Sequence, residues 1–383
     1  MNVLILGGDG YLGWPTSMYF SRLGYQVTIV DNFSKRKIEL EMGVSSLNEI
    51  LTLQERVSIW NKNIDNKINF LVGDLLNHKF LYNVLETSLP EVIIHYAEQP
   101  SAPYSMVDRE KSFFTQYNNV LGNLNLLFAI KKFCPDAHLI KLGTLGEYGT
   151  PNIDIEEGWL DIEHKGRKDR VLFPKKPGSF YHLSKVHDSN NIEFCSRNWG
   201  LRCTDLNQGV VYGIDTSETI MDKGLATSFH YDGVFGTVIN RFITQALLEK
   251  NLTVYGKGNQ KRGYLNILDT MKCVKISSEN YPKKGEFRVF NQFTESFTIN
   301  EIANLVIKSA HKENIKIKAN HIKNPRNEME DHYYNPINNN LLSLGLKPHK
   351  FNIDFIRNFI KNTKKSINKI NEELILPSIN WNN

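Results

Sequence analysis

Short apolar runs alternate with longer amphipathic stretches through the first half of the chain. The apolar runs have the length of buried strands, and the stretches between them repeat their apolar residues at helical spacing. We predict strands over residues 3–6, 26–30, 69–72, 92–95, 138–142 and 201–206, and helices over residues 11–23, about 80–85, about 111–133 and around 181–185. Strands that are apolar on both faces are typical of a parallel sheet covered by helices on either side. The predicted fold is therefore α/β, with a doubly wound parallel sheet.

From residue 207 onward the pattern changes to short pieces separated by glycines. We interpret residues 1–206 as one domain, with an insertion at about 34–67 that has room for a helix. Residues 207–383 are mainly a smaller ligand-binding subdomain, and part of the segment at about 262–283 is predicted to return to the first domain. The tail from Lys350 repeats Phe, Ile and Lys at near-helical spacing, which predicts an amphipathic helix with a solvated basic face. A membrane-binding or partner-binding helix is the alternative.

Composition and charge are those of a globular chain. The 383 residues are 41% hydrophobic and 23% charged, with a net charge of +5. Lysine and arginine are spread along the chain, so nucleic-acid binding is not favoured over an anionic small molecule. Four cysteines without CxxC spacing predict reduced thiols, and the apolar segment after Met1 is too short for a signal-peptide core or a membrane span. We expect no membrane span and a cytoplasmic location, or the plastid stroma if a transit segment has been removed.

The glycine pattern Gly7-x-x-Gly10-x-x-Gly13 follows the first predicted strand and opens a helix. Glycines at these positions allow a tight turn and the close approach of a pyrophosphate, whose charge is met by the helix N-terminus. Asp31 ends the second predicted strand, about twenty residues on, where a carboxylate can bind the ribose hydroxyls of an adenosine. Together these residues predict a Rossmann-type domain that binds NAD, because Asp31 would repel the 2′-phosphate of NADP.

Two neighbouring features bear on the same cofactor. Lys35 and Arg36 follow Asp31 closely and leave NADP as a minority interpretation. Gly73-Asp74-Leu75 follows the third predicted strand and can place an acid and a backbone group near adenine. A turn with a helix cap explains this segment equally well.

Tyr181 and Lys185 stand four residues apart, so they share one face of a helix. On that face the Lys185 ammonium is expected to lower the pKa of the Tyr181 phenol, so that a phenolate takes a hydroxyl proton while hydride leaves the same carbon. Thr144 follows a predicted strand, at the edge where active groups of open α/β sheets gather, and is placed to donate to the reacting oxygen. A simple strand-end cap is the alternative for Thr144. The predicted chemistry is alcohol oxidation.

The histidines do not predict a metal site. His182 and His187 are five residues apart and do not share a helix face, and no Cys, His or carboxylate spacing typical of zinc is present. His95 ends a predicted buried strand and is interpreted as structural, with its imidazole bonded to nearby backbone. We predict no metal cofactor.

Arginines near the glycine-rich loops of the second half provide a candidate site for a second anionic ligand. They are Arg241, Arg262 and Arg326. Guanidinium groups bind phosphate in a bidentate manner. Each arginine alone is typical of a solvated or salt-bridged side chain, but the three together favour a phosphate-bearing substrate.

These residues resemble the extended short-chain dehydrogenase/reductase superfamily, which contains the NAD-dependent nucleotide-sugar epimerases and dehydratases. Longer blocks are similar to one family within it, the UDP-sulfoquinovose synthases. The blocks are Asp154-Ile-Glu-Glu, Phe180-Tyr-His-Leu-Ser-Lys-Val-His-Asp188, Asp205-Leu-Asn-Gln-Gly-Val-Val-Tyr-Gly213, Val289-Phe-Asn-Gln-Phe-Thr-Glu295 and His332-Tyr-Tyr-Asn335. The resemblance runs from Val3 to about Pro348.

The resemblance implies a role for each matching residue. Thr144, Tyr181 and Lys185 form the catalytic triad. The implied NAD-binding residues are Gly7, Gly10, Tyr11, Leu12, Gly13, Asp31, Asn32, Arg36, Asp74, Leu75, Ala97, Asn119, Tyr181, Lys185, Gln208 and Val211. The implied residues for the UDP-sugar are Thr144, Tyr181, Gln208, Thr237, Arg241, Tyr255, Gln260, Arg262 and Arg326.

The resemblance also implies a reaction and partners. UDP-glucose would be oxidised at C4 by bound NAD, lose water across C5 and C6, take sulfite at C6 and regain the hydride. The sulfite would come free or from a donor protein, and the product would serve sulfolipid or glycan synthesis. A homodimer or higher homo-oligomer is implied as well.

Two places depart from related sequences. Where the family usually has Arg, this chain has Pro100, which removes a cation and a backbone N–H donor. Related 4,6-dehydratases carry Asp and Glu after the strand-end threonine, but this chain has Leu145 and Gly146, neither of which can transfer a proton. The loss of two negative charges favours an anion such as sulfite beside C6. His182 and Glu147 are then candidates for the proton relay.

Two other interpretations stay open. A UDP-sugar 4-epimerase or 4,6-dehydratase would need only NAD and the sugar. A non-catalytic NAD-binding scaffold or an RNA-binding relative is the other alternative, and the intact set of Thr144, Tyr181 and Lys185 disfavours it.

Overall fold

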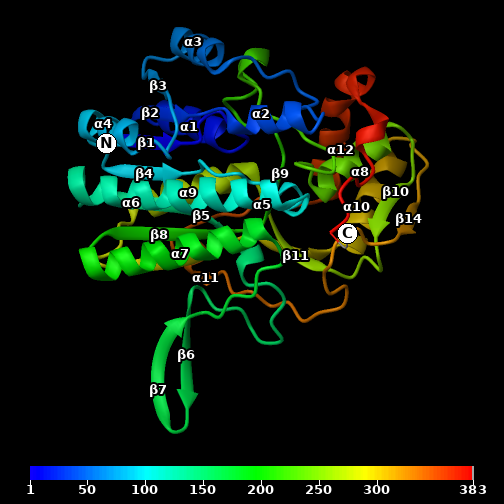
Figure 1. Cartoon of the computed structure of the whole chain (residues 1–383). Helices are drawn as coiled ribbons and strands as arrows, with labels where there is room; N and C mark the ends of the chain where they lie inside the picture. Colours follow the sequence, from blue (N-terminus) through cyan, green and yellow to red (C-terminus); the bar gives the residue numbers. More distant parts are fainter. Residues whose placement is uncertain (382–383) are drawn as a thin grey trace.

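A computed structural model of the chain describes residues 1–381. At its centre is a parallel sheet of seven strands in the order β12-β8-β5-β4-β1-β2-β3 (Figure 1). The strands are β1 (Asn2–Leu6), β2 (Gln26–Asp31), β3 (Ile68–Val72), β4 (Val92–His95), β5 (His138–Thr144), β8 (Arg202–Gln208) and β12 (Phe287–Gln292). The chain first winds outward from β1 to β3 and then in the opposite direction from β4 to β12. The predicted doubly wound α/β fold is confirmed.

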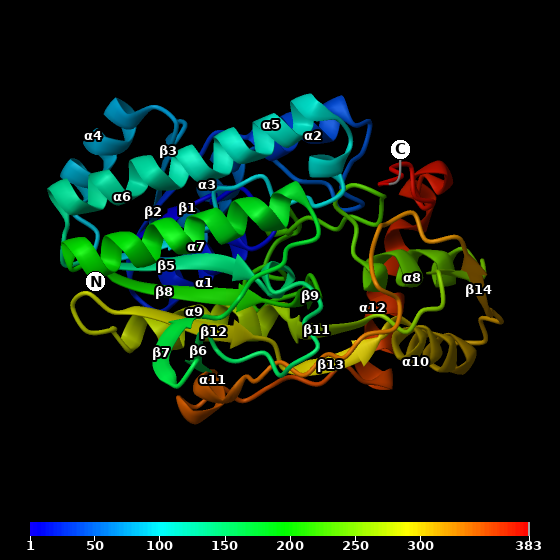
Figure 2. The same ribbon diagram turned by 60° about the horizontal axis from the view of Figure 1, so that its bottom comes forward.

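Alternate side chains of β1 face two different layers of helices. Val3 and Ile5 pack with α1 (Gly13–Arg22), α3 (Leu53–Asn63) and α9 (Ile267–Glu279). Leu4 and Leu6 pack with α4 (His78–Ser88), α6 (Gly122–Phe133) and α7 (Phe180–Trp199), which lie side by side in Figure 2. This division follows from the two-residue period of a strand, and it buries both faces of the sheet.

The insertion after β2 and the long helix after β4 both differ from the sequence prediction. The insertion holds two helices, α2 (Ser34–Glu41) and α3, and α3 begins with a capping box between Thr52 and Glu55. The helix predicted over 111–133 consists of α5 (Arg109–Gln116), a π-helical turn η2 (Tyr117–Leu121) and α6. π turns of this kind frequently mark functional sites.

The second region consists of helices and two small sheets. Its helices are α8 (Val238–Leu247), α10 (Ile299–Lys312) and α12 (Ile353–Thr363). One sheet joins β9 (Val210–Tyr212), β11 (Lys261–Asn266) and β13 (Glu295–Thr298), and the other joins β10 (Leu252–Tyr255) and β14 (Ala319–Ile322). Ile356, Phe359 and Ile360 of α12 lie in the apolar core, so the amphipathic helix predicted in the tail is confirmed and packs on the body of the protein.

Two elements from the second half of the chain join the first region. Helix α9 packs against α1 and β5, and β12 pairs with β8 as the edge strand of the main sheet. The return to the first region therefore reaches Gln292, beyond the predicted segment of about 262–283. The short helix α11 (Asn339–Ser343) packs beside β12.

A charged β-hairpin between β5 and α7 projects from the body of the protein (Figure 1). Its strands are β6 (Trp159–His164) and β7 (Arg167–Leu172), paired in antiparallel fashion. Lys165 and Gly166 both have positive φ, 51° and 76°, as a two-residue hairpin turn requires. The hydrophobic pattern did not predict this hairpin, because its strands contain few apolar residues.

The remaining elements are short turns of 3₁₀ helix. They are η1 (Tyr104–Met106), η3 (Leu145–Glu147), η4 (Lys223–Leu225), η5 (Lys364–Lys369) and η6 (Glu372–Leu374). Within residues 1–381, none of the helices is both long and apolar enough to cross a membrane. Over the same residues, the side chains of His, Cys, Asp and Glu form no group of three that could hold a metal ion. All four cysteines are free thiols.

Candidate active site

The residues predicted to act on ligands gather at the carboxyl ends of the central strands. The winding direction reverses between β1 and β4, and doubly wound folds bind ligands at such a point. In Figure 2 the ends of β5 and β8 point toward β9 and β11 of the second region. The candidate site is therefore built by both regions of the chain.

The predicted nucleotide loop forms a tight turn after β1. Gly7 has a φ of +85°, and a Cβ at this position would lie 2.8 Å from the backbone nitrogen of Ala97. Gly13 opens α1, and a Cβ there would lie 2.0 Å from the Gly7 oxygen. A Cβ at Gly10 would meet only that same oxygen, at 3.5 Å. The turn thus needs glycine for its own packing at two positions and keeps the N-terminus of α1 accessible to a pyrophosphate at the third.

Asp31 ends β2 beside this turn. Its carboxylate accepts hydrogen bonds of 2.8 Å from the backbone N–H groups of Asp9 and Phe33. Burial, with a contribution from Asp9, raises the pKa of Asp31 to about 6. The carboxylate is held by the backbone in one orientation, as a ribose-binding acid should be.

Arg36 pairs with Asp9, a carboxylate of the glycine turn. Its Nε lies 2.6 Å from Asp9 Oδ2. Because the guanidinium already pairs with a carboxylate, the structure offers no support for 2′-phosphate recognition by Arg36. Asn32 Nδ2 donates to Asp74 Oδ2 at 2.9 Å, which joins the ends of β2 and β3.

Tyr11 and Leu12 connect the loop to the second region. The Tyr11 hydroxyl donates to the Gly213 carbonyl oxygen at 2.5 Å. Leu12 packs in an apolar cluster with Val211. These contacts fix the loop relative to β9, so both regions build the candidate cofactor site.

Three other implied cofactor residues make contacts within the protein. Asn119, in the π turn, accepts a hydrogen bond from the Gln99 backbone N–H at 2.8 Å and donates to Ser184 Oγ at 3.0 Å. Leu75 is buried in the apolar core. Gln208 donates to a glutamine side chain of β12 at 3.1 Å. Asn119 therefore clamps the segment after β4 to α7.

Thr144, Tyr181 and Lys185 come together from β5 and α7. Thr144 Oγ1 accepts a hydrogen bond of 3.2 Å from Gly146 N, which leaves its hydroxyl hydrogen to donate to a ligand. Thr144 is thus a strand-end cap and also a candidate donor. The Tyr181 backbone N–H donates to Ser105 Oγ at 3.0 Å, and Lys185 Nζ lies 5.8 Å from the centre of the Tyr181 ring.

The electrostatics around Tyr181 differ from the prediction. Burial raises the pKa of Tyr181, and the carboxylates of Glu98 and Glu147 add to the rise. Lys185 Nζ lies 2.7 Å from Glu98 and donates to the Leu142 carbonyl at 2.6 Å. The prediction of a lowered pKa for this phenol is therefore wrong for the free protein, because burial raises it and the carboxylate of Glu98 adds to the rise.

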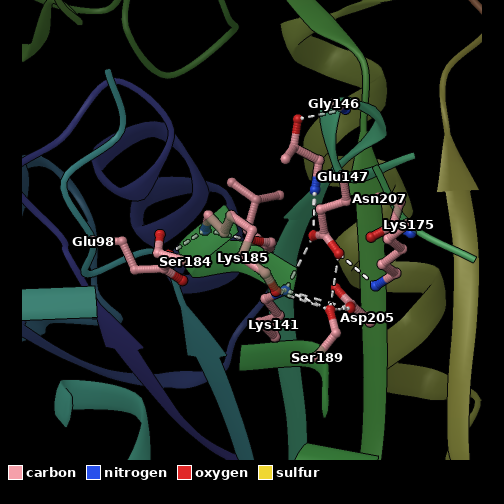
Figure 3. A network of polar contacts seen from close by, with 12 residues as sticks. Glu98, Lys141, Gly146, Glu147, Lys175, Ser184, Lys185, Ser189, Asp205 and Asn207 are labelled. Atoms are coloured by element: carbon pink, nitrogen blue, oxygen red, sulfur yellow. Dashed lines mark hydrogen bonds and ion pairs between the residues drawn. The ribbon is translucent and has the colours of Figure 1, made fainter. Parts of the chain in front are cut away.

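A buried network of charges lies beneath the triad (Figure 3). Lys141 Nζ of β5 is 3.3 Å from Glu147 Oε1 and 3.4 Å from Asp205 Oδ2, and it donates to Ser189 Oγ at 2.9 Å. Lys175 pairs with the second oxygen of Glu147. The interior tolerates these charges because each has a partner of opposite sign.

Glu147 lies in this network and not in the ligand site. Although burial opposes the change, Lys141 and Lys175 lower the pKa of Glu147 to about 2. Its carboxylate also accepts from the Thr144 backbone N–H at 3.2 Å. A carboxylate held in this way is a poor proton carrier, so the geometry favours positioning of Thr144 over the proton relay predicted for Glu147.

His182 lies where a side chain at residue 146 would extend. A Cβ on Gly146 would lie 2.4 Å from His182 Nε2 and Cδ2. The other ring nitrogen, Nδ1, is 3.0 Å from Ser179 Oγ. Burial, together with two nearby arginines, lowers the pKa of His182 to about 4, so the imidazole is neutral at neutral pH. Leu145 packs in an apolar cluster with Tyr148 and Phe293.

On the substrate side, Arg241 and Arg326 form no ion pair with a carboxylate of residues 1–381. Arg241 of α8 is 8% exposed. It stacks on the Tyr255 ring at 4.0 Å and donates to the Thr253 carbonyl at 3.1 Å. Arg326 lies over the Trp381 ring, at 5.5 Å from its centre. Burial lowers the pKa of Arg241, and Arg326 adds to the effect. Such guanidinium groups are suited to an anionic ligand.

Arg262 and Gln260 contact a carboxylate of the protein. Arg262 Nη2 is 2.5 Å from Glu328 Oε2, and Gln260 Nε2 is 3.4 Å from the other oxygen. Thr237 caps α8 one turn before its arginine, by accepting from Asn240 N at 3.4 Å. Two of the predicted substrate residues, Gln260 and Arg262, therefore share a carboxylate of the protein itself, that of Glu328.

His95 and Pro100 have other surroundings than expected. His95 is buried and burial lowers its pKa to about 4. Over the described residues neither of its ring nitrogens has a hydrogen-bond partner, so the predicted bond to backbone is wrong. Pro100 is exposed in the loop that leads to η1.

Sequence reasoning missed Glu98, Lys141 and Asp205. Lys141 and Asp205 interrupt apolar strands in the runs His138-Leu-Ile-Lys-Leu and Cys203-Thr-Asp-Leu. A charge in a buried strand needs an opposite charge nearby, so the two residues could have been paired from sequence.

Residues 3–291 match the NAD dependent epimerase/dehydratase family. Over 382 residues the chain is 48% identical to the chloroplastic UDP-sulfoquinovose synthase of Spinacia oleracea, which covers 99% of this chain and 79% of that protein. Over 384 residues it is 39% identical to the UDP-sulfoquinovose synthase of Sulfolobus acidocaldarius, with 100% and 98% covered. The chain belongs to the UDP-sulfoquinovose synthase family.

Solved structures place this member of the UDP-sulfoquinovose synthase family in a wider fold group. A UDP-glucose 4-epimerase from Thermotoga maritima with UDP-glucose has a TM-score of 0.69 at 18% identity and covers 96% of this chain and 100% of that chain. A UDP-glucuronic acid 4-epimerase from Bacillus cereus with UDP-glucuronic acid and NAD also has a TM-score of 0.69 at 18% identity, with 96% and 99% covered. These likenesses confirm the Rossmann-type fold.

Proposed function

We propose that the protein is an NAD-dependent UDP-sulfoquinovose synthase, which converts UDP-glucose and sulfite to UDP-6-sulfo-6-deoxyglucose. One observation carries the proposal. The triad of Thr144, Tyr181 and Lys185 is complete in a chain that matches a UDP-sulfoquinovose synthase at 48% identity over 99% of its length.

NAD fits the residues around the first strand. The glycine turn would take the pyrophosphate at the N-terminus of α1, and Asp31 would take the adenosine ribose. When bound, NAD supplies the oxidation at C4 of the sugar and the return of hydride at the end. Nucleotide released from the purified protein by denaturation is expected to be NAD, and recovery of NADP would contradict this assignment.

The UDP moiety fits the unpaired cations of the second region. Arg241 and Arg326 would bind the diphosphate, close to the capped N-terminus of α8 at Thr237. Tyr255 and Gln260 lie beside Arg241. Arg262 would join them by exchanging its ion pair with Glu328 for the ligand.

Tyr181, as the phenolate, takes the proton of the 4-hydroxyl, and Thr144 donates a hydrogen bond to the same oxygen. A ketone at C4 makes the C5 hydrogen acidic. We assign its removal to His182, which is neutral and lies over Gly146. His182 passes this proton to the 6-hydroxyl, which leaves as water and gives a 4-keto-5,6-ene.

Sulfite adds through sulfur to C6, and a proton returns to C5. Tyr181 gives its proton back to the C4 oxygen as the carbonyl is reduced. In total, UDP-glucose and bisulfite give the sulfonate and one water. Leu145 and Gly146 bring no carboxylate to this part of the site, which favours the approach of an anion.

A homodimer and a reducing compartment complete the proposal. Large aromatic side chains are exposed on the neighbouring helices α5, α6 and α7, namely Phe113, Phe128, Phe180 and Phe194. Such side chains suit an interface between two copies of the chain. Light scattering is expected to give twice the chain mass of 44.1 kDa. The free thiols suit the cytoplasm or a plastid stroma, and no nucleic-acid partner is proposed.

Mass spectrometry of the purified protein with UDP-glucose and sulfite tests the proposal. We expect a sulfonated nucleotide sugar that appears only when both substrates are present. Efficient production of UDP-galactose or a 6-deoxy-4-keto sugar, with sulfite ignored, would instead identify a 4-epimerase or a 4,6-dehydratase. Absence of any turnover with NAD bound would support a non-catalytic scaffold.

A further inference from the structure

We propose that Glu98 is the positioning residue of the catalytic lysine: its buried carboxylate orients Lys185 Nζ and sets the charge that the Tyr181 phenol experiences. This inference rests on the proposed function, because it concerns the alcohol-oxidation step. Glu98 has no role in the predicted triad or among the predicted ligand residues.

Glu98 and Lys185 form a buried ion pair. The side chains of Glu98 and Lys185 are 2% and 3% exposed, and their charged atoms lie 2.7 Å apart. Lys185 also donates to the Leu142 carbonyl at 2.6 Å. Figure 3 shows the Glu98 carboxylate directed at Lys185 from one side, with the Lys141 network on the other. Two acceptors from different strand ends therefore define where the ammonium lies.

The segment that carries Glu98 is itself fixed. The backbone N–H of Gln99 donates to Asn119 Oδ1 at 2.8 Å, and Asn119 Nδ2 donates back to the Gln99 carbonyl at 3.2 Å. The Gln99 side chain donates to Thr115 Oγ1 at 2.8 Å. The π turn η2 presents Asn119 for this clamp. The position of Glu98 is thus set by a local distortion of a long helix, as is common near functional sites.

Other titratable groups near Glu98 do not replace its charge. His95 Nε2 is 3.9 Å away, and burial keeps this imidazole neutral by lowering its pKa to about 4. Asp188 is one turn beyond Lys185, and over the described residues its carboxyl oxygens have no hydrogen-bond partner. Burial and then the charge of Glu98 raise the pKa of Asp188.

The remaining charges belong to the network beneath the site. Lys141 pairs with Glu147 and Asp205, and Lys175 pairs with Glu147. Lys185 therefore has Glu98 as its carboxylate partner within the described residues, and the pair contributes no net charge beside the phenol. Loss of the carboxylate would leave the ammonium charge uncancelled. The phenolate would then be more favourable, and the pKa of Tyr181 would fall.

Glu98→Gln keeps the shape of the side chain and removes its charge. In the full-length holoenzyme we measure the single-turnover reduction of bound NAD by UDP-glucose without sulfite, as a function of pH. We expect the midpoint of the pH–rate profile to move to lower pH by about one unit. The rate at the plateau should fall about tenfold, with KM for UDP-glucose within about twofold of normal, since the lysine loses its orientation but the sugar site is intact.

A second readout does not depend on turnover. The tyrosinate absorbance of Tyr181 is obtained by subtracting the absorbance of the protein that also carries Tyr181→Phe. In the Glu98→Gln background this absorbance should develop at lower pH than in the wild-type background. Glu193→Gln is the matched control. It removes a carboxylate from the same helix, one that pairs with Arg197 and not with Lys185, so it should leave the pH profile unchanged.

An unshifted profile in Glu98→Gln, or an equal shift in Glu193→Gln, would overturn the proposal. If Glu98→Gln does not fold, the Glu98→Asp variant tests the proposal in its place. This variant keeps the charge with a shorter reach, so it should retain the wild-type midpoint at a lower rate, and a wild-type rate would overturn the proposal. Failure of the wild type to reduce NAD with UDP-glucose would instead count against the proposed function.

Discussion

Lys141 beneath Tyr181 and Arg241 on the substrate side are both buried cations, but they are satisfied in opposite ways. Lys141 has Glu147 and Asp205 within 3.4 Å. Arg241 has an aromatic ring and a backbone carbonyl but no carboxylate partner within the described residues. A paired interior charge can hold neighbouring groups in place, whereas an unpaired buried cation is suited to an anion that arrives as a ligand.

The two arrangements should therefore respond differently to removal of the cation. Where the cation is paired, its loss leaves carboxylates buried without compensation, which is costly. Where it is unpaired, its loss removes a desolvation cost from the free protein and a binding contact from the complex.

Lys141→Met should have the largest effect. We expect a loss of about 3–5 kcal/mol in the free energy of unfolding, because Glu147 and Asp205 lose their shared ammonium. Urea denaturation measures this loss. Lys250→Met is the control, since Lys250 pairs with Glu372 on the surface and should contribute less than about 1 kcal/mol. Equal effects of the two substitutions would contradict the role of the network.

Tyr181→Phe should come next. The ring stays in place but the acid/base group is lost, so turnover should fall at least about a hundredfold with nearly unchanged binding of UDP-glucose. Tyr333→Phe, which alters an exposed hydroxyl bound to Asp154, should leave turnover unchanged. Near-normal turnover in the Tyr181 variant would remove this residue from the mechanism.

Arg241→Met should have the smallest effect and the opposite sign in stability. UDP binding, measured by calorimetry, should weaken about 10- to 100-fold, while the free energy of unfolding stays equal or rises. Arg288→Met provides the comparison, because Arg288 donates to Thr204 and to backbone at the β12 edge and should not affect UDP. If the Arg241 variant is destabilised and still binds UDP normally, the guanidinium is structural.

The periodic elements of the fold could be predicted from sequence. The strands of the main sheet from β1 to β8 and the helical tail follow from apolar patterns that tertiary structure did not override. The β6–β7 hairpin and β12 could not be found in this way, because the hairpin is charged and β12 joins a sheet assembled much earlier in the chain. The π turn at Tyr117–Leu121 has no local signal in an otherwise helical run.

The identity of the site residues was easier to predict than their electrostatics. The spacing of Tyr181 and Lys185 indicated a shared helix face, but the partner of Lys185 comes from the β4 end, far away in sequence. Burial and Glu98 then reverse the expected shift in the pKa of Tyr181. Long-range partners of this kind decide the charge of a group and cannot be found from spacing alone.

The central claim is that this site joins sulfite to the carbon skeleton after oxidation at C4, and isotope exchange tests it most directly. The purified protein is incubated in heavy water with UDP-glucose, with and without sulfite, and the product is examined by mass spectrometry and NMR. The proposed chemistry predicts UDP-sulfoquinovose with deuterium at C5, formed only when sulfite is present. A sulfonated product without deuterium at C5, or UDP-galactose formed equally well in the absence of sulfite, would contradict it.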